Sequence, residues 1–141
     1  MFLDEVGQYL QANGLGTLGV DLFLGSMPID APNVTTQDAI TALYETPGFP
    51  GQYVHSTLGV DWEQPVLQFI TRGAPYDYAG VRAHAETLYV ALGRIRNQLL
   101  SGTWYLWCLP LHTPNPAIGP DDYARPRLSC QFRIGKALSA S

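Results

Sequence analysis

The most regular pattern in the sequence is an apolar repeat that predicts one long helix. Apolar residues recur at steps of four, three, four, three and four, at Val81, Ala85, Leu88, Leu92, Ile95 and Leu99. This spacing places them on one face of an α-helix. Asp77 is suited to be the N-cap, and Ser101-Gly102 ends the pattern. We therefore expect a helix with one buried face that packs on the remaining elements.

Shorter segments on both sides of this helix carry helix and strand signals. Residues 1–12 have apolar residues at helical spacing, with Asn13-Gly14 as a stop signal. Brief apolar runs bounded by Gly, Pro or Asn predict strands at residues 22–24, 39–44, 66–71 and 104–109. The run at 104–109 is apolar on both faces, so we expect this strand to be central. Segments rich in Pro and Gly predict long loops at residues 46–64 and 110–126.

The last predicted strand, from residue 127 to residue 134, alternates clearly between apolar and polar side chains. Its apolar face consists of Leu128, Cys130, Phe132 and Ile134. Its polar face consists of Arg127, Ser129, Gln131 and Arg133. Because successive side chains of a strand point to opposite faces of the sheet, we expect one face on the core and the other toward water or a partner.

The order of these elements predicts the fold class. A helix and three strands are followed by the long helix and two more strands, and only the long helix connects strands by a crossover. We therefore predict an α+β fold with a single, mostly antiparallel (mixed) sheet of about five strands. The N-terminal helix and the long helix pack on one face of this sheet, and long Pro/Gly-rich loops join its strands. The 141 residues, 46% of them hydrophobic, suit a single domain over residues 1–141.

Composition excludes several classes of protein. No apolar run approaches the ~20 residues that cross a bilayer, so we expect no membrane span. Asp4 and Glu5 stand where a signal peptide would be basic, so we expect the chain to mature in a cytoplasm. Cys108 and Cys130 are too few for a disulfide scaffold and lack the spacing of a zinc site. We predict that both are buried thiols.

Charge is divided unevenly along the chain. Residues 1–71 contain eight acids and no Lys or Arg, whereas residues 72–141 contain all eight basic residues and four acids. The two halves therefore carry −8 and +4, which sum to the net charge of −4. Charged residues form only 14% of the chain, which indicates that neighbouring molecules cover part of the surface. Either the halves meet head to tail between identical subunits, or they interleave within one fold.

The sequence contains no catalytic, cofactor-binding or metal-binding pattern, so we predict that the protein is not an enzyme. Residues 14–19 match G-x-G-x-x-G, but a helix precedes them and a strand follows, which is the reverse of a dinucleotide site. We expect a flexible linker there. His55, His84 and His112 lack metal-ligand spacing. His84 borders the buried face of the long helix, and we expect it to be a hydrogen-bonded structural histidine.

Aromatic residues are numerous, and one function they allow is the stacking of sugars or nucleobases. Because Trp104 and Trp107 lie on opposite faces of one predicted strand, we expect at least one of them in the core. The net charge of −4 argues against general affinity for nucleic acid, which needs a cationic surface. An Arg-lined patch remains able to touch DNA that passes nearby.

Several short segments resemble a known family in their order and spacing. They are residues 39–51 (AITALYETPGFPG), 65–68 (PVLQ), 72–74 (RGA), 77–78 (DY), 99–103 (LLSGT) and 125–129 (RPRLS). From about residue 37 onward, together with the N-terminal helix, the chain resembles the minor capsid or tail-terminator proteins of long-tailed bacteriophages and prophages. The resemblance implies an α/β subunit that assembles, usually as a hexameric ring, on the end of the tail tube.

The same resemblance implies what such a ring does. It stops polymerisation of the tail tube protein and docks the tail to the head-tail connector or stopper protein. DNA passes through its lumen without sequence-specific binding. The protein is then part of the virion, in the tail or neck, and is assembled in the cytoplasm of the host bacterium. The family is not defined by catalytic residues, so the resemblance implies no active site and no cofactor.

For the contact between subunits, the chemistry of the side chains points to three sets of candidate residues. The cations Arg72, Arg125, Arg127 and Arg133 are candidates to pair across a subunit boundary with the acids Asp30, Asp38, Glu45 and Glu63. Phe49, Tyr53 and Trp62 in the predicted aromatic loop are candidate anchors, with local packing under their own loop as the equal alternative.

Three other functions remain open from the sequence. The first is a head-side joining, stopper or other neck protein. The second is a small aromatic-rich module that binds a glycan or peptide in a cleft. The third is a hydrolase whose site is assembled from His112, Asp121 and Asp122.

Overall fold

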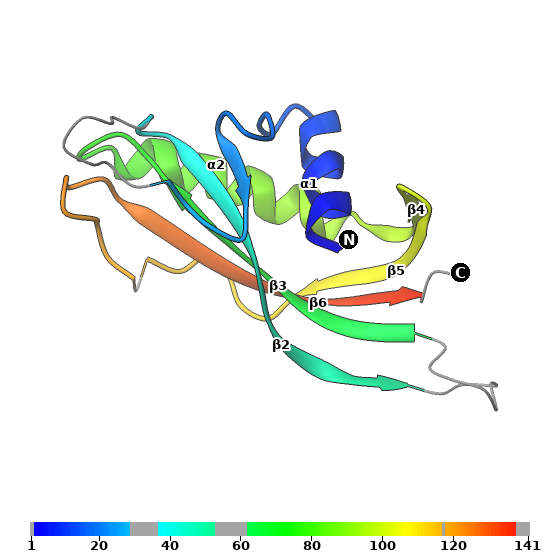
Figure 1. Ribbon diagram of the computed structural model, residues 1–141. Helices are drawn as coiled ribbons and strands as arrows, with labels where there is room; N and C mark the ends of the chain where they lie inside the picture. The colour runs from blue at the N-terminus through cyan, green and yellow to red at the C-terminus, as the bar shows by residue number, and fades with distance from the viewer. Residues whose placement is uncertain (1, 29–36, 53–61, 117, 138–141) are drawn as a thin grey trace.

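Among the residues that the structure describes, two helices and six strands form an α+β fold, which confirms the predicted class with one strand more than expected. The computed structural model describes residues 2–28, 37–52, 62–116 and 118–137 (Figure 1). The elements in chain order are α1 (Phe2–Ala12), β1 (Leu22–Leu24), β2 (Ile40–Gln52), β3 (Trp62–Arg72), α2 (Tyr78–Gly93), β4 (Arg96–Leu100), β5 (Thr103–Pro110) and β6 (Arg127–Ala137).

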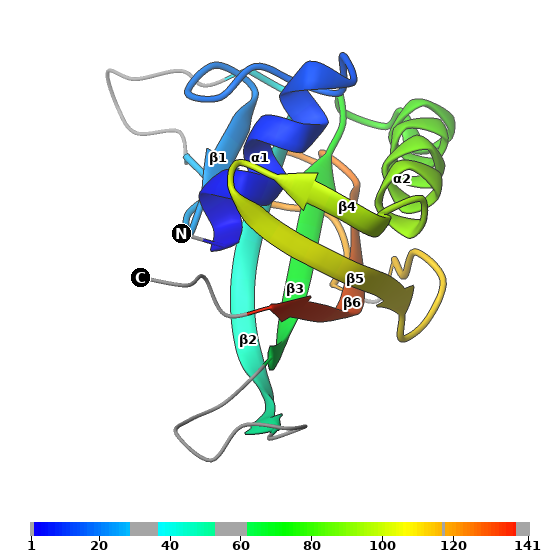
Figure 2. The ribbon, with the colours of Figure 1, turned by 90° about the vertical axis from the view of Figure 1, so that its right-hand side faces the viewer.

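The six strands form one curled, mixed sheet in the order β1-β2-β3-β6-β5-β4. Strands β1 and β2 are parallel, and every other pair of neighbours is antiparallel. Helices α1 and α2 lie on the same face of the sheet, as predicted (Figures 1 and 2). We call the opposite face the outer face. Among the described elements, no helix covers it.

The core fills the space between the helices and the sheet. The apolar face of β6 is completely buried, as its alternation predicts. The register places Phe132 of β6 beside Leu67 of β3, and Cys130 beside Phe69, so adjacent strands contribute to one apolar layer. The helices cover this layer with Phe2, Leu3, Val6, Leu10, Val81, Ala85, Leu88 and Leu92.

Both cysteines are buried free thiols, as predicted. Burial raises the pKa of Cys130 to about 11. Burial also raises the pKa of Cys108 above that of an ordinary thiol. Neither side chain is therefore ionised at neutral pH, and both act as small apolar core residues.

The long helix is shorter than its apolar repeat predicts. Helix α2 ends at Gly93, and residues 96–100 form the edge strand β4 instead of two more helical turns. The reason lies in Ser101-Gly102, which have φ values of 49° and 88°. Two successive positive φ values are typical of the tight turn of a β-hairpin, and this turn joins β4 to β5. The same dipeptide also fits a helix stop, so the sequence pattern did not separate the two structures.

In the predicted loop at residues 46–64, residues 46–52 and 62–64 belong to a β-hairpin, and residues 53–61 lie outside the described residues. Strand β2 continues to Gln52 and β3 begins at Trp62, and their far parts extend beyond the helices (Figure 1). Two register shifts, before and after Phe49, accommodate the Pro and Gly residues of β2. Because this part of β2 pairs with β3 on one side only, its prolines do not interrupt a second ladder of hydrogen bonds.

The prediction that a tryptophan of β5 lies in the core is wrong. A register shift between Tyr105 and Trp107 breaks the alternation, so that Tyr105 and Cys108 face the core. Trp104 is 44% exposed, and Trp107 is half-buried on the outer face. Strand β5 is an inner strand, but it stands next to the edge rather than at the centre of the sheet.

Gly135 of β6 provides the space that Trp107 occupies. A Cβ atom at this glycine would lie only 2.4 Å from Cε2 of the Trp107 ring. The ring also lies beneath the guanidinium of Arg133, whose Cζ is 5.6 Å from the ring centre. Two features therefore hold Trp107 on the outer face. Gly135 has no side chain and leaves space for the ring, and Arg133 makes a cation–π contact with it.

A buried carboxylate connects α1 to β5. Glu5 is only 7% exposed, although glutamate is rarely buried without partners. Its two oxygens accept hydrogen bonds from Thr103 Oγ1 at 2.6 Å and from Tyr105 Oη at 2.8 Å. Burial, and next the hydrogen bond to Glu5, raise the pKa of Tyr105, so its hydroxyl remains a donor at every physiological pH. These two bonds fix the N-terminal helix to the sheet.

We predict that Tyr105→Phe destabilises the protein by about 1.5–3 kcal/mol, because the buried carboxylate then loses one of its two donors. The free energy of unfolding, measured by urea denaturation, checks this value. Tyr123→Phe is the matched control, since the Tyr123 side chain is exposed. Equal stability of Tyr105→Phe and the wild type would show that the bond to Glu5 contributes nothing.

A second prediction concerns the contact between Gly135 and Trp107. Gly135→Ala forces the indole ring to move and is expected to cost about 1–3 kcal/mol. The same substitution in a Trp107→Leu background should cost clearly less, because the ring is absent. A double-mutant cycle measured by thermal unfolding gives this coupling. Equal costs in the two backgrounds would contradict the contact.

Candidate interaction surface

The candidate contact residues lie at three levels along β3. Phe49, Trp62 and Glu63 belong to the projecting end of the β2–β3 hairpin. Glu45 of β2 and Arg133 of β6 lie level with the middle of β3, opposite Leu67 and Val66. At the other end of the sheet lie Arg72, Arg125, Arg127 and Asp38. Asp30 and Tyr53 are outside the described residues. Glu45 is exposed, whereas Glu63 forms an ion pair of 3.5 Å with Lys136 of the same chain.

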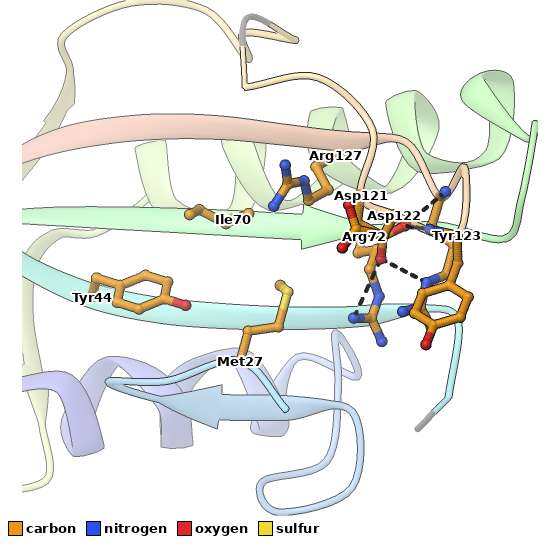
Figure 3. A pocket seen from close by; sticks show the side chains of 9 residues that line it. Met27, Tyr44, Ile70, Arg72, Asp121, Asp122, Tyr123 and Arg127 are labelled. Atoms are coloured by element: carbon orange, nitrogen blue, oxygen red, sulfur yellow. Dashed lines mark hydrogen bonds and ion pairs between the residues drawn. The ribbon is translucent and has the colours of Figure 1, made fainter. Parts of the chain in front are cut away.

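Arg72 and Arg125 are buried and form ion pairs within their own chain. Their side chains are 2% and 3% exposed. Nε of Arg125 lies 2.8 Å from Oδ2 of Asp121, and a guanidinium nitrogen of Arg125 lies 3.6 Å from Oδ1 of Asp38. Arg72 lies 3.9 Å from the same Asp121 oxygen (Figure 3). We call these four residues the arginine–aspartate cluster.

Arg72 also binds the chain that leads into β2. Its guanidinium donates hydrogen bonds to the carbonyl oxygens of Asp38 at 3.0 Å and Gln37 at 2.5 Å. Arg72 is the last residue of β3, so it fixes the start of one strand to the end of the next. The cluster therefore joins three separate segments of the chain: the entry to β2, the end of β3 and the loop before β6.

Asp121 organises the loop before β6 through its backbone as well as its charge. Its Oδ1 accepts hydrogen bonds from the backbone N–H groups of Tyr123 at 2.9 Å and Arg125 at 3.0 Å. Although burial acts to raise the pKa of Asp121, these N–H groups and the Arg125 guanidinium outweigh it and lower the pKa below its usual value. The Tyr123 ring lies 4.9 Å from the Arg125 guanidinium carbon. The loop is thus ordered locally and then held to the sheet.

The other two candidate arginines also have partners in their own chain. Arg127 donates hydrogen bonds to the carbonyl oxygens of Gly119 at 3.0 Å and Ile118 at 3.3 Å. Arg133 donates to Oε1 of Gln64 through two of its nitrogens and stacks on Trp107. Since each of the four arginines has a structural role within the subunit, their pairing across a subunit boundary stays a prediction.

A hollow of about 400 Å³ opens on the outer face beside the cluster. Tyr44, Ile70 and Met27 form its apolar part (Figure 3). Its charged part consists of Arg72, Asp121, Asp122, Arg125 and Arg127. Of its charged groups, Arg72 and Arg125 form ion pairs with Asp121. Asp121 is not suited to acid–base chemistry, because guanidinium and backbone donors hold its carboxylate in the ionised form.

The hydrolase residues predicted as an alternative do not share this hollow. Asp121 and Asp122 line it, whereas His112 does not. Nδ1 of His112 lies 2.7 Å from the Thr113 carbonyl oxygen. Among the residues that the structure describes, no three His, Cys, Asp or Glu side chains form a group that could hold a metal ion. The structure therefore does not bring the three proposed hydrolase residues together.

His84 is a structural histidine, as predicted. It is half-buried, and its Nε2 lies 3.3 Å from Oγ1 of Thr41, which in turn lies 2.9 Å from Oγ1 of Thr71. Burial lowers the pKa of His84, so the ring is neutral at pH 7. This chain of hydrogen bonds connects α2 to β2 and β3.

In the described ranges, no helix has the length and apolar character of a membrane span.

One exposed surface was not predicted from the sequence. Leu99 of β4 and Trp104 of β5 lie opposite each other in the register, and they are 62% and 44% exposed. Arg96, on the same edge strand, is also exposed. The sequence pattern does not indicate this group, because the apolar repeat places residues 96–100 in the long helix. The Ser101-Gly102 turn was the available signal, since it also fits a hairpin.

We predict that Asp121→Asn destabilises the protein by about 2–3 kcal/mol, because two buried guanidinium groups lose their shared carboxylate. The stabilisation that the Asp121 carboxylate provides depends on pH, because the pKa of Asp121 is lower in the folded than in the unfolded state. This stabilisation is fully present above the unfolded-state pKa of about 3.9, and it is lost as the pH falls through the lower folded-state pKa. Urea unfolding at several pH values checks both statements. Asp122→Asn is the control, and an equal loss there would contradict the assignment to Asp121.

Comparison with known families identifies the chain. The model of the bacteriophage tail terminator protein family matches residues 9–134, from within α1 to the inner part of β6. No curated protein matches the sequence. The matched residues include the last turn of α1, all of α2, the arginine–aspartate cluster and β4. The chain therefore belongs to the bacteriophage tail terminator protein family.

Proposed function

We propose that this protein forms a ring on the end of the phage tail tube, stops polymerisation of the tube and docks the tail to the head-tail connector. The observation that carries the proposal is the family match over residues 9–134. The partners are other copies of the chain, most simply six in a ring, the tail tube protein and the connector. DNA passes through the ring without sequence-specific contacts. The protein is assembled in the bacterial cytoplasm and remains in the virion tail.

Features of the surface support a structural rather than a catalytic role. The outer face of the sheet carries Tyr44, Trp107 and other half-buried side chains, with no helix over it in the described chain. The β2–β3 hairpin projects beyond the helices (Figure 1). In this part of the sheet β3 also pairs with β6, whereas the described part of β2 beyond Leu43 pairs with β3 alone, so its other side is suited to contact with a neighbouring molecule. Only 14% of the residues are charged, which suits a surface that other subunits cover.

The proposal is tested by polymerising the tail tube protein of the same phage in the presence of this protein. We expect tubes that stop growing and carry a ring at one end, seen by negative-stain electron microscopy. Tubes polymerised alone provide the control for length. Unchanged tube length, with the protein found instead on isolated head connectors, would favour a head-side joining protein. Binding to neither particle would contradict a role in the neck.

A further inference from the structure

We infer that the basic edge of the sheet in one copy docks on the acidic edge of the next copy. The basic edge consists of Arg94, Arg96, Leu99 and Trp104, around β4. The acidic edge consists of Val20, Asp21 and Glu45, along β1 and the part of β2 beyond it. This inference rests on the proposed ring and assigns the surfaces that form it.

Charge is divided across the sheet as it is along the sequence, because the first three strands are neighbours and the last three strands are neighbours. Strands β4, β5 and β6 contain four cations and no acid: Arg96, Arg127, Arg133 and Lys136. Strands β1, β2 and β3 contain the acids Glu45 and Glu63, with Arg72 as the last residue of β3. Because β1, β2 and β3 are neighbours, and β6, β5 and β4 are neighbours, the two open edges carry opposite charge. The two halves also meet within one copy, at the Glu63–Lys136 ion pair between β3 and β6, so the division by charge concerns the edges of the sheet and not its centre.

The basic edge has the composition of a protein–protein contact. All residues of β4 except Leu100 are exposed. Arg94, which caps the end of α2, and Arg96, at the start of β4, are both exposed. Leu99 and Trp104 add an exposed apolar pair beside them. Arginine and tryptophan are enriched at interfaces, and an exposed apolar pair next to cations is suited to a partner that is acidic at its rim.

Among the described residues, no further strand pairs with most of the acidic edge. Strand β1 pairs with β2 only over residues 41–43, and beyond Leu43 the described part of β2 pairs with β3 alone. Glu45 is exposed on this open part. Asp21 immediately precedes β1, and the neighbouring Val20 is 52% exposed. No Lys or Arg occurs before residue 72, so no cation of β1 or β2 offsets these acids.

The two edges are different surfaces, so they join copies head to tail rather than face to face. A head-to-tail contact makes a ring when its rotation closes. It also covers two sheet edges that would otherwise be open to uncontrolled strand pairing. The hollow beside the arginine–aspartate cluster is less suited to this contact, because Arg72 and Arg125 already form ion pairs with Asp121 and Asp38.

Charge reversal tests the inference. Arg96→Glu makes the basic edge acidic, and Glu45→Arg makes the acidic edge basic. We expect each variant alone to self-associate at least about tenfold more weakly than the wild type, because like charges then face each other. A mixture of the two should recover association, since every contact in an alternating ring again joins opposite charges. Multi-angle light scattering of the single variants and of the mixture measures this. Glu86→Arg, on the exposed side of α2, is the matched control and should associate like the wild type.

The outcomes separate this inference from the proposed function. Rings from both single variants would overturn the assignment of the edges while leaving the ring itself intact. Loss of association in both variants without recovery on mixing would also overturn it. If the wild type assembles only on tail tubes, the same variants and mixture are scored by tube capping, with the same expected pattern. A wild type that neither associates nor caps tubes would contradict the proposed function and this inference together.

Discussion

Both helices cover the same face of the sheet, and the other features of the structure follow from this arrangement. Two helices of 11 and 16 residues lie on the same face of six strands. The apolar core therefore forms on that face, and Glu5 and His84 fix the helices to it through hydrogen bonds. In the described part of the chain, no helix lies over the outer face, and β1 and β4 are the edge strands of the sheet. The proposed contacts with other molecules use these surfaces.

The charged residues divide into those that hold the subunit together and those that remain for contact. Arg72, Arg125 and Asp121 belong to the first kind, since they are buried and pair within the chain. Arg96 and Glu45 belong to the second kind, since they are exposed on opposite edges of the sheet. Buried ion pairs fix the arrangement of segments that have little apolar surface of their own. Exposed charges mainly determine which surfaces meet and how fast they associate.

Local patterns predicted the elements whose alternation is undisturbed, above all β6 and α1. They failed where one dipeptide fits two structures, as Ser101-Gly102 fits both a helix end and a hairpin turn. They also failed where a register shift reverses the alternation, as it does between Tyr105 and Trp107. The burial of Arg72 could not be predicted, because its carboxylate partner Asp121 is far away in the sequence. Asp121 is only four residues from Arg125, but the second partner of Arg125, Asp38, is again distant in the sequence. The division of charge along the sequence was visible, but its meaning depended on the strand order.

The most direct test of the proposed ring and of its contacts is a cryo-electron microscopy map of the protein assembled on a tail tube. We expect a closed ring at the end of the tube. In that ring, β4 of each copy lies against the edge formed by β1 and β2 of the next copy. A ring whose copies meet through α1 and α2, with both sheet edges left open, would contradict the division of surfaces described above. Protein absent from the tube end would contradict the proposed function itself.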